Sequence, residues 1–223
     1  LAGIEANPKS MQLHMTLAQL FMTSQRTEDA ISIVQKVIEF DPKNNSHNLT
    51  LAGLYWGSGK EQKAAEIIQA LISSDPKNED KRIQVAGFYI ARKRLDEAER
   101  VLKEGMEQIK KSFKSRLMLS DIYLNLNRPD ASIATLKESL SLDKDAKKPE
   151  IIQTKNALAK VYLLRQEVDE AKKYIDEVLK SNPKDVEAHF TKGNIHLLKG
   201  EGQSAIPEFR TVLNERPQFT IAY

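Results

Sequence analysis

The amino-acid sequence predicts an all-α fold, a solenoid of about six similar helix pairs stacked along the chain. Three observations predict it. A dipeptide that ends in proline recurs at intervals of 34 residues, two columns of small residues keep the same register in every unit, and a third column carries a ring in every unit. A fixed period of this length is typical of repeat architectures, in which each unit packs mainly against its neighbours.

The period sets the boundaries of the units. Pro42 and Pro76 each follow an aspartate and lie 34 residues apart, and Pro183 and Pro217 show the same interval. We therefore expect a single array over residues 1–223. Its parts are the end of a preceding repeat at 1–10, full repeats at 11–44, 45–78, 79–112, 113–146, 152–185 and 186–219, an insertion at 147–151, and the start of a further repeat at 220–223.

Columns of small residues predict where the paired helices meet. Small side chains let two helices approach closely, and a ring at a nearby position fills the remaining space. The first small column is Ala18, Ala52, Ala86, Ser120, Ala159 and Gly193, the second is Ala30, Ala64, Ala98, Ser132, Ala171 and Ala205, and the ring column is Phe21, Tyr55, Tyr89, Tyr123, Tyr162 and His196.

Apolar spacing within each unit predicts two helices. In the first unit Leu17 and Phe21 are about one turn apart, and the second half continues with Ala30, Val34 and Val37 at helical spacing. The proline-containing dipeptide ends the second helix, because proline biases the residue before it away from helix. After the insertion, Pro149 suits a first helical turn, so that helix is expected to start early. The turns between paired helices read TSQRTED, GSGKEQ, ARKRLDE, NLNRPD, RQEVDE and KGEGQS.

Together these features resemble the tetratricopeptide repeat (TPR) family over nearly the whole chain. The resemblance implies a right-handed superhelix in which the first helix of each pair lines a concave surface. It also implies partners that are peptides, helices or whole proteins.

A second, less specific resemblance comes from the amino-acid sequence of the last units. The stretches DEAKKYIDEVLKSNPKDVEAHF and AIPEFRTVLNERPQFTIAY look like large bacterial TPR proteins. Many of those are envelope-associated lipoproteins linked to exopolysaccharide or protein export. This resemblance favours a periplasmic or envelope location over a cytoplasmic one.

Three columns of the first helices share one face and form the candidate partner site, because positions i, i+4 and i+7 of a helix align. The outer two columns are almost wholly apolar. The middle column holds Gly53 and Gly87, and glycine inside a helix costs about 1 kcal/mol relative to alanine, which indicates a need for space. The predicted partner-binding residues are Met15, Gln19, Met22, Leu49, Gly53, Trp56, Ile83, Gly87, Ile90, Leu117, Asp121 and Leu124.

Two interpretations of these columns remain open at the level of sequence. They can line an apolar groove that accepts a hydrophobic helix or strand of a partner. They can instead pack between neighbouring first helices, with glycine allowing the approach. In the fifth and sixth units the same face carries Asn156, Lys160 and Asn194, so the expected groove becomes polar there.

The stretch GSGKEQ suggests a phosphate-binding loop, but its spacing does not fit. Gly53 and Gly59 are separated by five residues, and Glu61 follows Lys60 where the loop requires serine or threonine. We therefore expect a turn between helices, ended by glycine.

Composition excludes further classes of function. The 34 basic residues exceed the 31 acidic ones by three, without the clustered basic face that nucleic acid requires. The chain has no cysteine, which excludes disulfides and thiolate metal sites. His189 and His196 are seven residues apart, about 10 Å along a helix, too far to share a metal ion. No apolar run is long enough to span a membrane.

The sequence therefore predicts a non-catalytic scaffold with a protein or peptide partner. We expect no nucleic acid, no small-molecule substrate, no metal or cofactor and no direct membrane contact. One alternative is a self-assembling scaffold whose terminal repeats stack head-to-tail. Another is an accessory segment of a larger enzyme, since a chain that begins at Leu1 is expected to be a piece of a longer protein.

Overall fold

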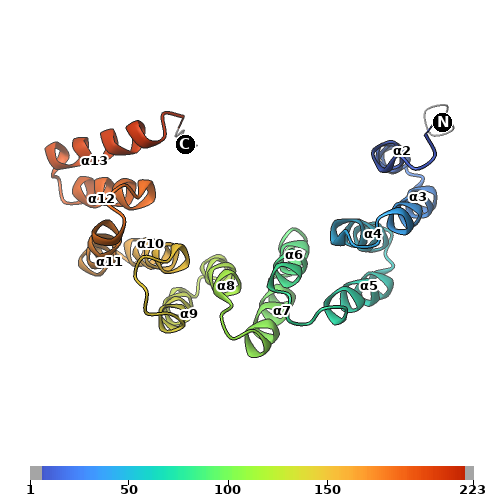
Figure 1. Cartoon of the computed structure of the whole chain (residues 1–223), viewed down its shortest axis with the longest axis horizontal. Coiled ribbons are helices and arrows are strands. Elements are labelled where there is room, and N and C mark those ends of the chain that lie inside the picture. The colour runs from blue at the N-terminus through green and yellow to red at the C-terminus, as the bar shows by residue number, and fades with distance from the viewer. Residues whose placement is uncertain (1–6, 219–223) are drawn as a thin grey trace. The chain divides into compact units, whose positions relative to one another are not determined.

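The computed structural model describes residues 7–218 and confirms the all-α prediction (Figure 1). Within that range the chain forms twelve helices and no strand. It divides into two compact units, residues 1–101 and 102–223, and the division falls within helix α7. The predicted start of a further repeat at 220–223 lies outside the described residues.

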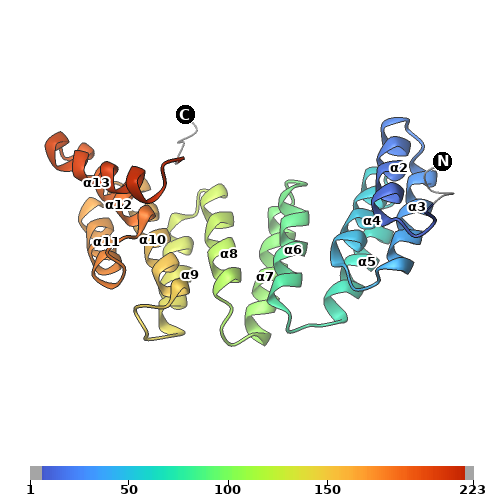
Figure 2. The same cartoon turned by 45° about the horizontal axis from the view of Figure 1, so that its top comes forward.

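The helices alternate with short turns in both units (Figures 1 and 2). The first unit contains α2 (Met11–Thr23), α3 (Thr27–Phe40), α4 (Asn45–Gly57), α5 (Glu61–Ser73), α6 (Glu79–Ile90) and the first half of α7 (Leu95–Gln108). The second contains the rest of α7 with α8 (Phe113–Asn125), α9 (Pro129–Ser141), α10 (Pro149–Leu164), α11 (Val168–Ser181), α12 (Val186–Leu198) and α13 (Gly202–Glu215). The helices thus follow one another in pairs, and α10 begins inside the predicted insertion 147–151, before the predicted repeat 152–185.

Helix α10 begins at Pro149, as predicted from the insertion, and is three residues longer than α8 or α12. Proline is favoured in a first helical turn because the N–H that it lacks would have no partner inside the helix. Among residues 7–218, no helix combines the length and the apolar character needed to cross a lipid bilayer.

One residue in each turn between the first and second helix of a pair has a left-handed backbone, and these residues lie in register. Only two of the six are glycine, namely Gly59 at φ 77° and Gly200 at φ 75°; the others are Gln25, Lys93, Asn127 and Gln166. The next residue donates its N–H to the carbonyl of the ring column, as from Lys60 to Tyr55 at 2.9 Å. This bond closes the first helix. GSGKEQ is therefore a turn, as predicted.

The two small columns face each other within a pair. In the fourth repeat both carry serine, and the hydroxyls of Ser120 and Ser132 are hydrogen bonded at 2.6 Å. In the sixth repeat, an ideal Cβ at Gly193 would stand 2.6 Å from the ring of Phe209, so the glycine is required for this approach. The ring column lies beside them, with Tyr162 stacked on Tyr174 at a centroid distance of 5.8 Å.

A buried polar column, not anticipated from the sequence, joins the first helix of a pair to its second. It lies one residue before Met15 and its equivalents. Arg82 donates to the carbonyl of Val101 at 3.2 Å, and Lys155 lies 2.9 Å from Glu177. The other members with such contacts are His14 against the ring of Phe40, Arg116 beside Glu138, and His189 beside Glu208.

Candidate functional site

The predicted partner-binding residues of the first unit all lie at its surface or just below it. Gln19 and Met22 are exposed, and the other seven are partly buried: Met15, Leu49, Gly53, Trp56, Ile83, Gly87 and Ile90. None is fully buried, so a partner can reach this face. Partial burial fits either interpretation of the columns, and the assignment of a binding role stays a prediction.

Gly53 and Gly87 differ in what surrounds them. A Cβ at Gly53 would lie 2.8 Å from Nη2 of Arg92, so the space beside this glycine is filled by a side chain of the same chain. A Cβ at Gly87 would meet nothing within 4 Å. Of the two gaps expected from the sequence, only the one at Gly87 is open.

Trp56 belongs to a cluster of rings and guanidinium groups. Its ring meets Phe88 and Tyr89 edge-on at centroid distances of 6.0 and 6.3 Å. Arg94 lies 5.3 Å above the Trp56 ring, and Arg92 lies 3.5 Å above Phe88. These contacts join α4 to α6. At Trp56 the structure therefore shows packing between neighbouring first helices, the second of the two interpretations of the columns.

In the second unit, the predicted residues line a cavity. Leu117, Asp121 and Leu124 of α8 border a hollow of about 320 Å³, together with Gln153 and Lys160 of α10. The cavity therefore lies on the face of the first helices that the columns predicted.

A second cavity adjoins the first. It has a volume of about 600 Å³ and shares Gln153, Lys160 and Glu187 with its neighbour. Its apolar lining includes Ile152 and Phe190, and Lys184 and Arg216 also line it. The two cavities are neighbours along α8, α10 and α12, and together we call them the α10 hollow.

Charges at the α10 hollow are of both signs. Lys160 pairs with Glu187 where the two cavities meet. Burial raises the pKa of Asp121, although the positive charge of Lys160 partly opposes that rise. Asn156, whose side chain is buried, donates to Asp185 at 2.9 Å and so ties α10 to the residue that caps α12. The hollow is thus lined by apolar side chains together with polar groups and charges of both signs.

The first unit has a cavity of about 580 Å³, but in a different place. It lies between the loop around Pro42 and helix α5, and it includes Asn48, Asn78 and Lys81. No predicted partner-binding residue lines it. No sequence signal pointed to it, because its walls come from loops, from α5 and from positions of α4 and α6 that the three columns do not include.

The family models that match this chain agree with its geometry. One tetratricopeptide repeat model matches residues 15–79 and 156–218, and another matches 55–114 and 89–148. The chain belongs to the tetratricopeptide repeat family. Proteins with this TPR fold are generally non-catalytic scaffolds for protein interactions.

Known proteins similar to this TPR chain support the fold. The DnaJ homolog subfamily C member 7 homolog of Schizosaccharomyces pombe is 38% identical over 64 residues, which are 29% of this chain and 13% of that protein. The structure of TTC0263, a thermophilic TPR protein of Thermus thermophilus, has a TM-score of 0.53 at 21% identity and covers 84% of this chain and 100% of that one. The structure of Pseudomonas aeruginosa PilF has a TM-score of 0.54 at 17% identity and covers 93% of this chain and 92% of that one.

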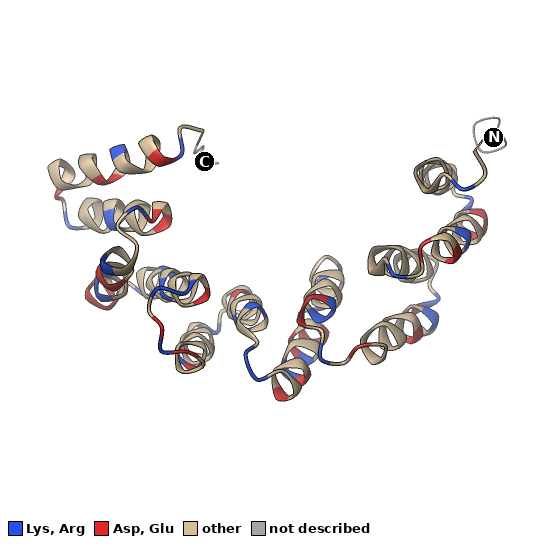
Figure 3. Cartoon of the chain, in the orientation of Figure 1, with Lys and Arg blue, Asp and Glu red and all other residues tan. Residues whose placement is uncertain are grey.

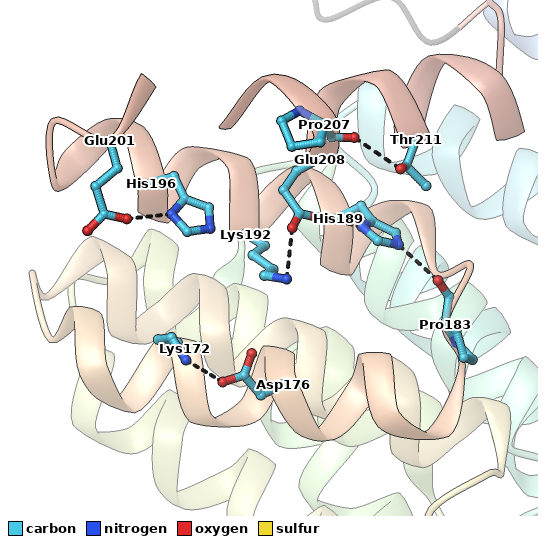
Figure 4. A network of polar contacts seen from close by, with 10 residues as sticks. All are labelled: Lys172, Asp176, Pro183, His189, Lys192, His196, Glu201, Pro207, Glu208 and Thr211. Atoms are coloured by element: carbon cyan, nitrogen blue, oxygen red, sulfur yellow. Dashed lines mark hydrogen bonds and ion pairs between the residues drawn. The ribbon is translucent and has the colours of Figure 1, made fainter. Parts of the chain in front are cut away.

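A second polar cluster of this TPR chain joins α12 to α13 (Figure 4). Glu208 accepts from His189 at 2.6 Å and from Lys192 at 2.8 Å, and the other ring nitrogen of His189 lies 2.9 Å from the carbonyl of Pro183. The separate pair of His196 and Glu201 is 2.6 Å apart. Within the described range, no group of three or more histidine, aspartate or glutamate side chains is arranged to hold a metal ion.

Proposed function

We propose that this chain is a non-catalytic TPR scaffold that binds a peptide, helix or protein partner on the face of its first helices. The α10 hollow carries the proposal. Its lining combines apolar side chains with charged and polar groups, which is the usual composition of a site that holds a protein segment.

The hollow suits an extended or helical segment of a partner with at least one apolar side chain. Leu117, Leu124 and Phe190 offer apolar contact, while Asp121 and Arg216 can pair with charges of either sign. In the first unit, the open space at Gly87, beside Ile83 and Ile90, is the corresponding place for such contact. The other predicted residues of that unit border it on the same helical face.

The setting of a bacterial envelope or export assembly is part of this proposal. It is supported by the amino-acid sequence of the last units. The similar solved structures are all below 25% sequence identity to this chain and support the fold alone. If the chain is a segment of a larger enzyme, the same hollow serves as its docking surface, and the chain by itself has no turnover.

Photocrosslinking tests the location of the partner site. A benzophenone amino acid replaces Gln153, which is exposed and lines both parts of the hollow. The matched control carries it at Lys173, which is exposed on α11 outside the hollow. We expect a specific protein of the native host to be crosslinked from position 153 and not from position 173.

Calorimetry with the crosslinked partner then tests the chemistry of the site. Leu124→Glu places a charge in the hollow, and Gln153→Trp adds a large ring at an exposed position that lines both cavities. We expect each to weaken binding at least about tenfold, or about 1.4 kcal/mol. Leu164→Glu changes an equally apolar but 71% exposed residue outside the hollow and should bind as the unaltered chain does. Unchanged affinity in folded Gln153→Trp would refute the proposed site.

A further inference from the structure

Lysines gather on two loops of the second unit, one between α7 and α8 and one between α9 and α10 (Figure 3). Residues 110–114 and 143–148 carry six lysines and two aspartates, a formal net charge of +4. The whole chain carries +3, so these two short stretches more than account for its positive excess. We call the six residues the lysine patch: Lys110, Lys111, Lys114, Lys144, Lys147 and Lys148.

Asp143 holds the two loops of the patch together. Its carboxylate accepts a hydrogen bond from Lys111 at 2.9 Å, across the gap between the loops, and another from Lys148 at 2.5 Å. The backbone of the second loop is fixed as well, because the N–H of Asp145 donates to Asp143 at 3.1 Å and the N–H of Lys147 donates to Asp145 at 3.0 Å. The fold therefore assembles the patch from residues that are 32 positions apart in the sequence.

Three lysines of the patch have positive charges that the chain does not neutralise. Lys110, Lys144 and Lys147 are exposed, and no carboxylate of the described residues lies within ion-pair distance of them. Helices α8 and α10 begin within or directly after the two stretches, and neither has a side-chain hydrogen bond that caps its first turn. A helix N-terminus carries partial positive charge and also favours an anion. The patch is thus complementary to a negatively charged partner.

Among anionic partners, an acidic protein segment fits the patch best. The apolar residues of the two stretches are Phe113, which is 7% exposed, and Ala146, so the patch has no large apolar group to insert into a lipid surface. Two loops also give a shorter basic face than the phosphate backbone of a nucleic acid requires. The α10 hollow, by contrast, begins close by, because Ile152 and Gln153 lie within about one helical turn of Pro149.

We propose that the lysine patch binds an acidic stretch of the same partner segment whose apolar side chain is held by the α10 hollow. This inference rests on the function proposed for the hollow and adds the class of partner, a segment with aspartate or glutamate next to an apolar anchor. Pairing at the exposed lysines speeds association and sets the direction in which the segment lies. The contact weakens as the salt concentration rises, since exposed charges are screened.

Fluorescence anisotropy of the whole chain with a labelled polyglutamate peptide tests the patch separately from the hollow. The patch variant replaces three exposed lysines by glutamine: Lys110→Gln, Lys144→Gln and Lys147→Gln. The matched control makes the same change at three exposed lysines of the first unit: Lys9→Gln, Lys36→Gln and Lys77→Gln. Both should fold, because all six side chains are exposed. We expect the patch variant to bind at least about tenfold more weakly than the unaltered chain, and the control about twofold or less.

Two further measurements separate the patch from the hollow and from other anions. Gln153→Trp should bind polyglutamate as the unaltered chain does, and the partner peptide crosslinked from position 153, identified by mass spectrometry, should contain acidic residues. Polyglutamate binding without a crosslink would overturn the role of the hollow, and a crosslink without polyglutamate binding would overturn that of the patch. The proposal also fails if the control variant loses as much affinity as the patch variant. Tighter binding of phosphatidylserine vesicles or of single-stranded DNA than of polyglutamate would overturn the acidic segment as the partner.

Discussion

The guanidinium of Arg92 occupies the space that a side chain at Gly53 would need. An ideal Cβ at Gly53 would stand 2.8 Å from Nη2 of Arg92. The same guanidinium lies 3.5 Å above the ring of Phe88 and donates to the carbonyl of Phe88 at 3.0 Å. Burial lowers the pKa of Arg92. The glycine thus allows an arginine of the next repeat to pack onto the first helix.

This relationship makes the two glycines of the column respond differently to alanine. Gly87→Ala should stabilise the chain by about 1 kcal/mol, because it gains helix propensity in open space. Gly53→Ala should gain less, since it displaces a cation–π contact worth about 0.5–1 kcal/mol. In an Arg92→Ala background, Gly53→Ala should recover the full gain. Urea unfolding of the four variants measures these changes in the free energy of unfolding. Equal effects of Gly53→Ala with and without Arg92 would show that Arg92 does not limit the space beside Gly53.

The contact between Gly193 and Phe209 predicts a larger effect. Gly193→Ala places a Cβ 2.6 Å from a ring that lies between α12 and α13, which should destabilise the chain by about 1–3 kcal/mol despite the better helix propensity of alanine. Phe209→Leu removes the ring, so Gly193→Ala should cost less in that background. Thermal unfolding of the single and double variants checks this, and additive losses would contradict the assigned contact.

The fold was predictable because its determinants are local and repeated. The spacing of small residues predicted the helix pairs, and the hydrogen bond between Ser120 and Ser132 confirms that the two small columns meet. The early start of α10 followed from the fixed φ of Pro149. Each of these features depends on a residue type at a known helical position.

The candidate site was less predictable because it depends on contacts between repeats. Nothing in the columns indicates that Arg92, far along the chain, fills the space at Gly53, or that Trp56 packs against Phe88. The buried polar column of Arg82 and Lys155 had a readable signal, namely a polar or charged residue in one register position of every repeat. The cavity between the loop around Pro42 and α5 had none, because no residue of the three columns lines it.

The Arg82 side chain predicts a cost for breaking the polar column. It is 2% exposed, and it donates to the carbonyls of Pro76 at 3.1 Å and Val101 at 3.2 Å. Arg82→Ala should destabilise the chain by about 3 kcal/mol, because two hydrogen bonds from a charged donor are lost and a buried side chain is removed. Arg82→Lys should restore only part of this, since an ammonium group cannot span both carbonyls as a guanidinium does. Urea unfolding measures the free energy of unfolding of both variants. A smaller loss of stability for Arg82→Ala than for Arg92→Ala would contradict the prediction.

The cluster around Glu208 predicts an acid-sensitive contact between α12 and α13. Burial opposes ionisation of Glu208, but hydrogen bonds from Lys192 and His189 outweigh it, so its pKa lies below the ordinary value of 4.5. A carboxyl whose pKa is lower in the folded state stabilises the fold above its unfolded pKa. This stabilisation is lost as the pH falls from about 4.5 through the folded value.

Glu208→Gln should therefore lower the melting temperature near neutral pH, and the difference from the unaltered chain should shrink below about pH 4.5. The control is Glu201→Gln, which removes a carboxylate that also contacts a histidine but is 49% exposed. Its effect should be smaller, since exposed ion pairs contribute about 1 kcal/mol or less. Scanning calorimetry from neutral pH to about pH 3 compares the two variants. A Glu208→Gln deficit that stays constant across this range would show that the carboxylate acts through packing and not through its charge.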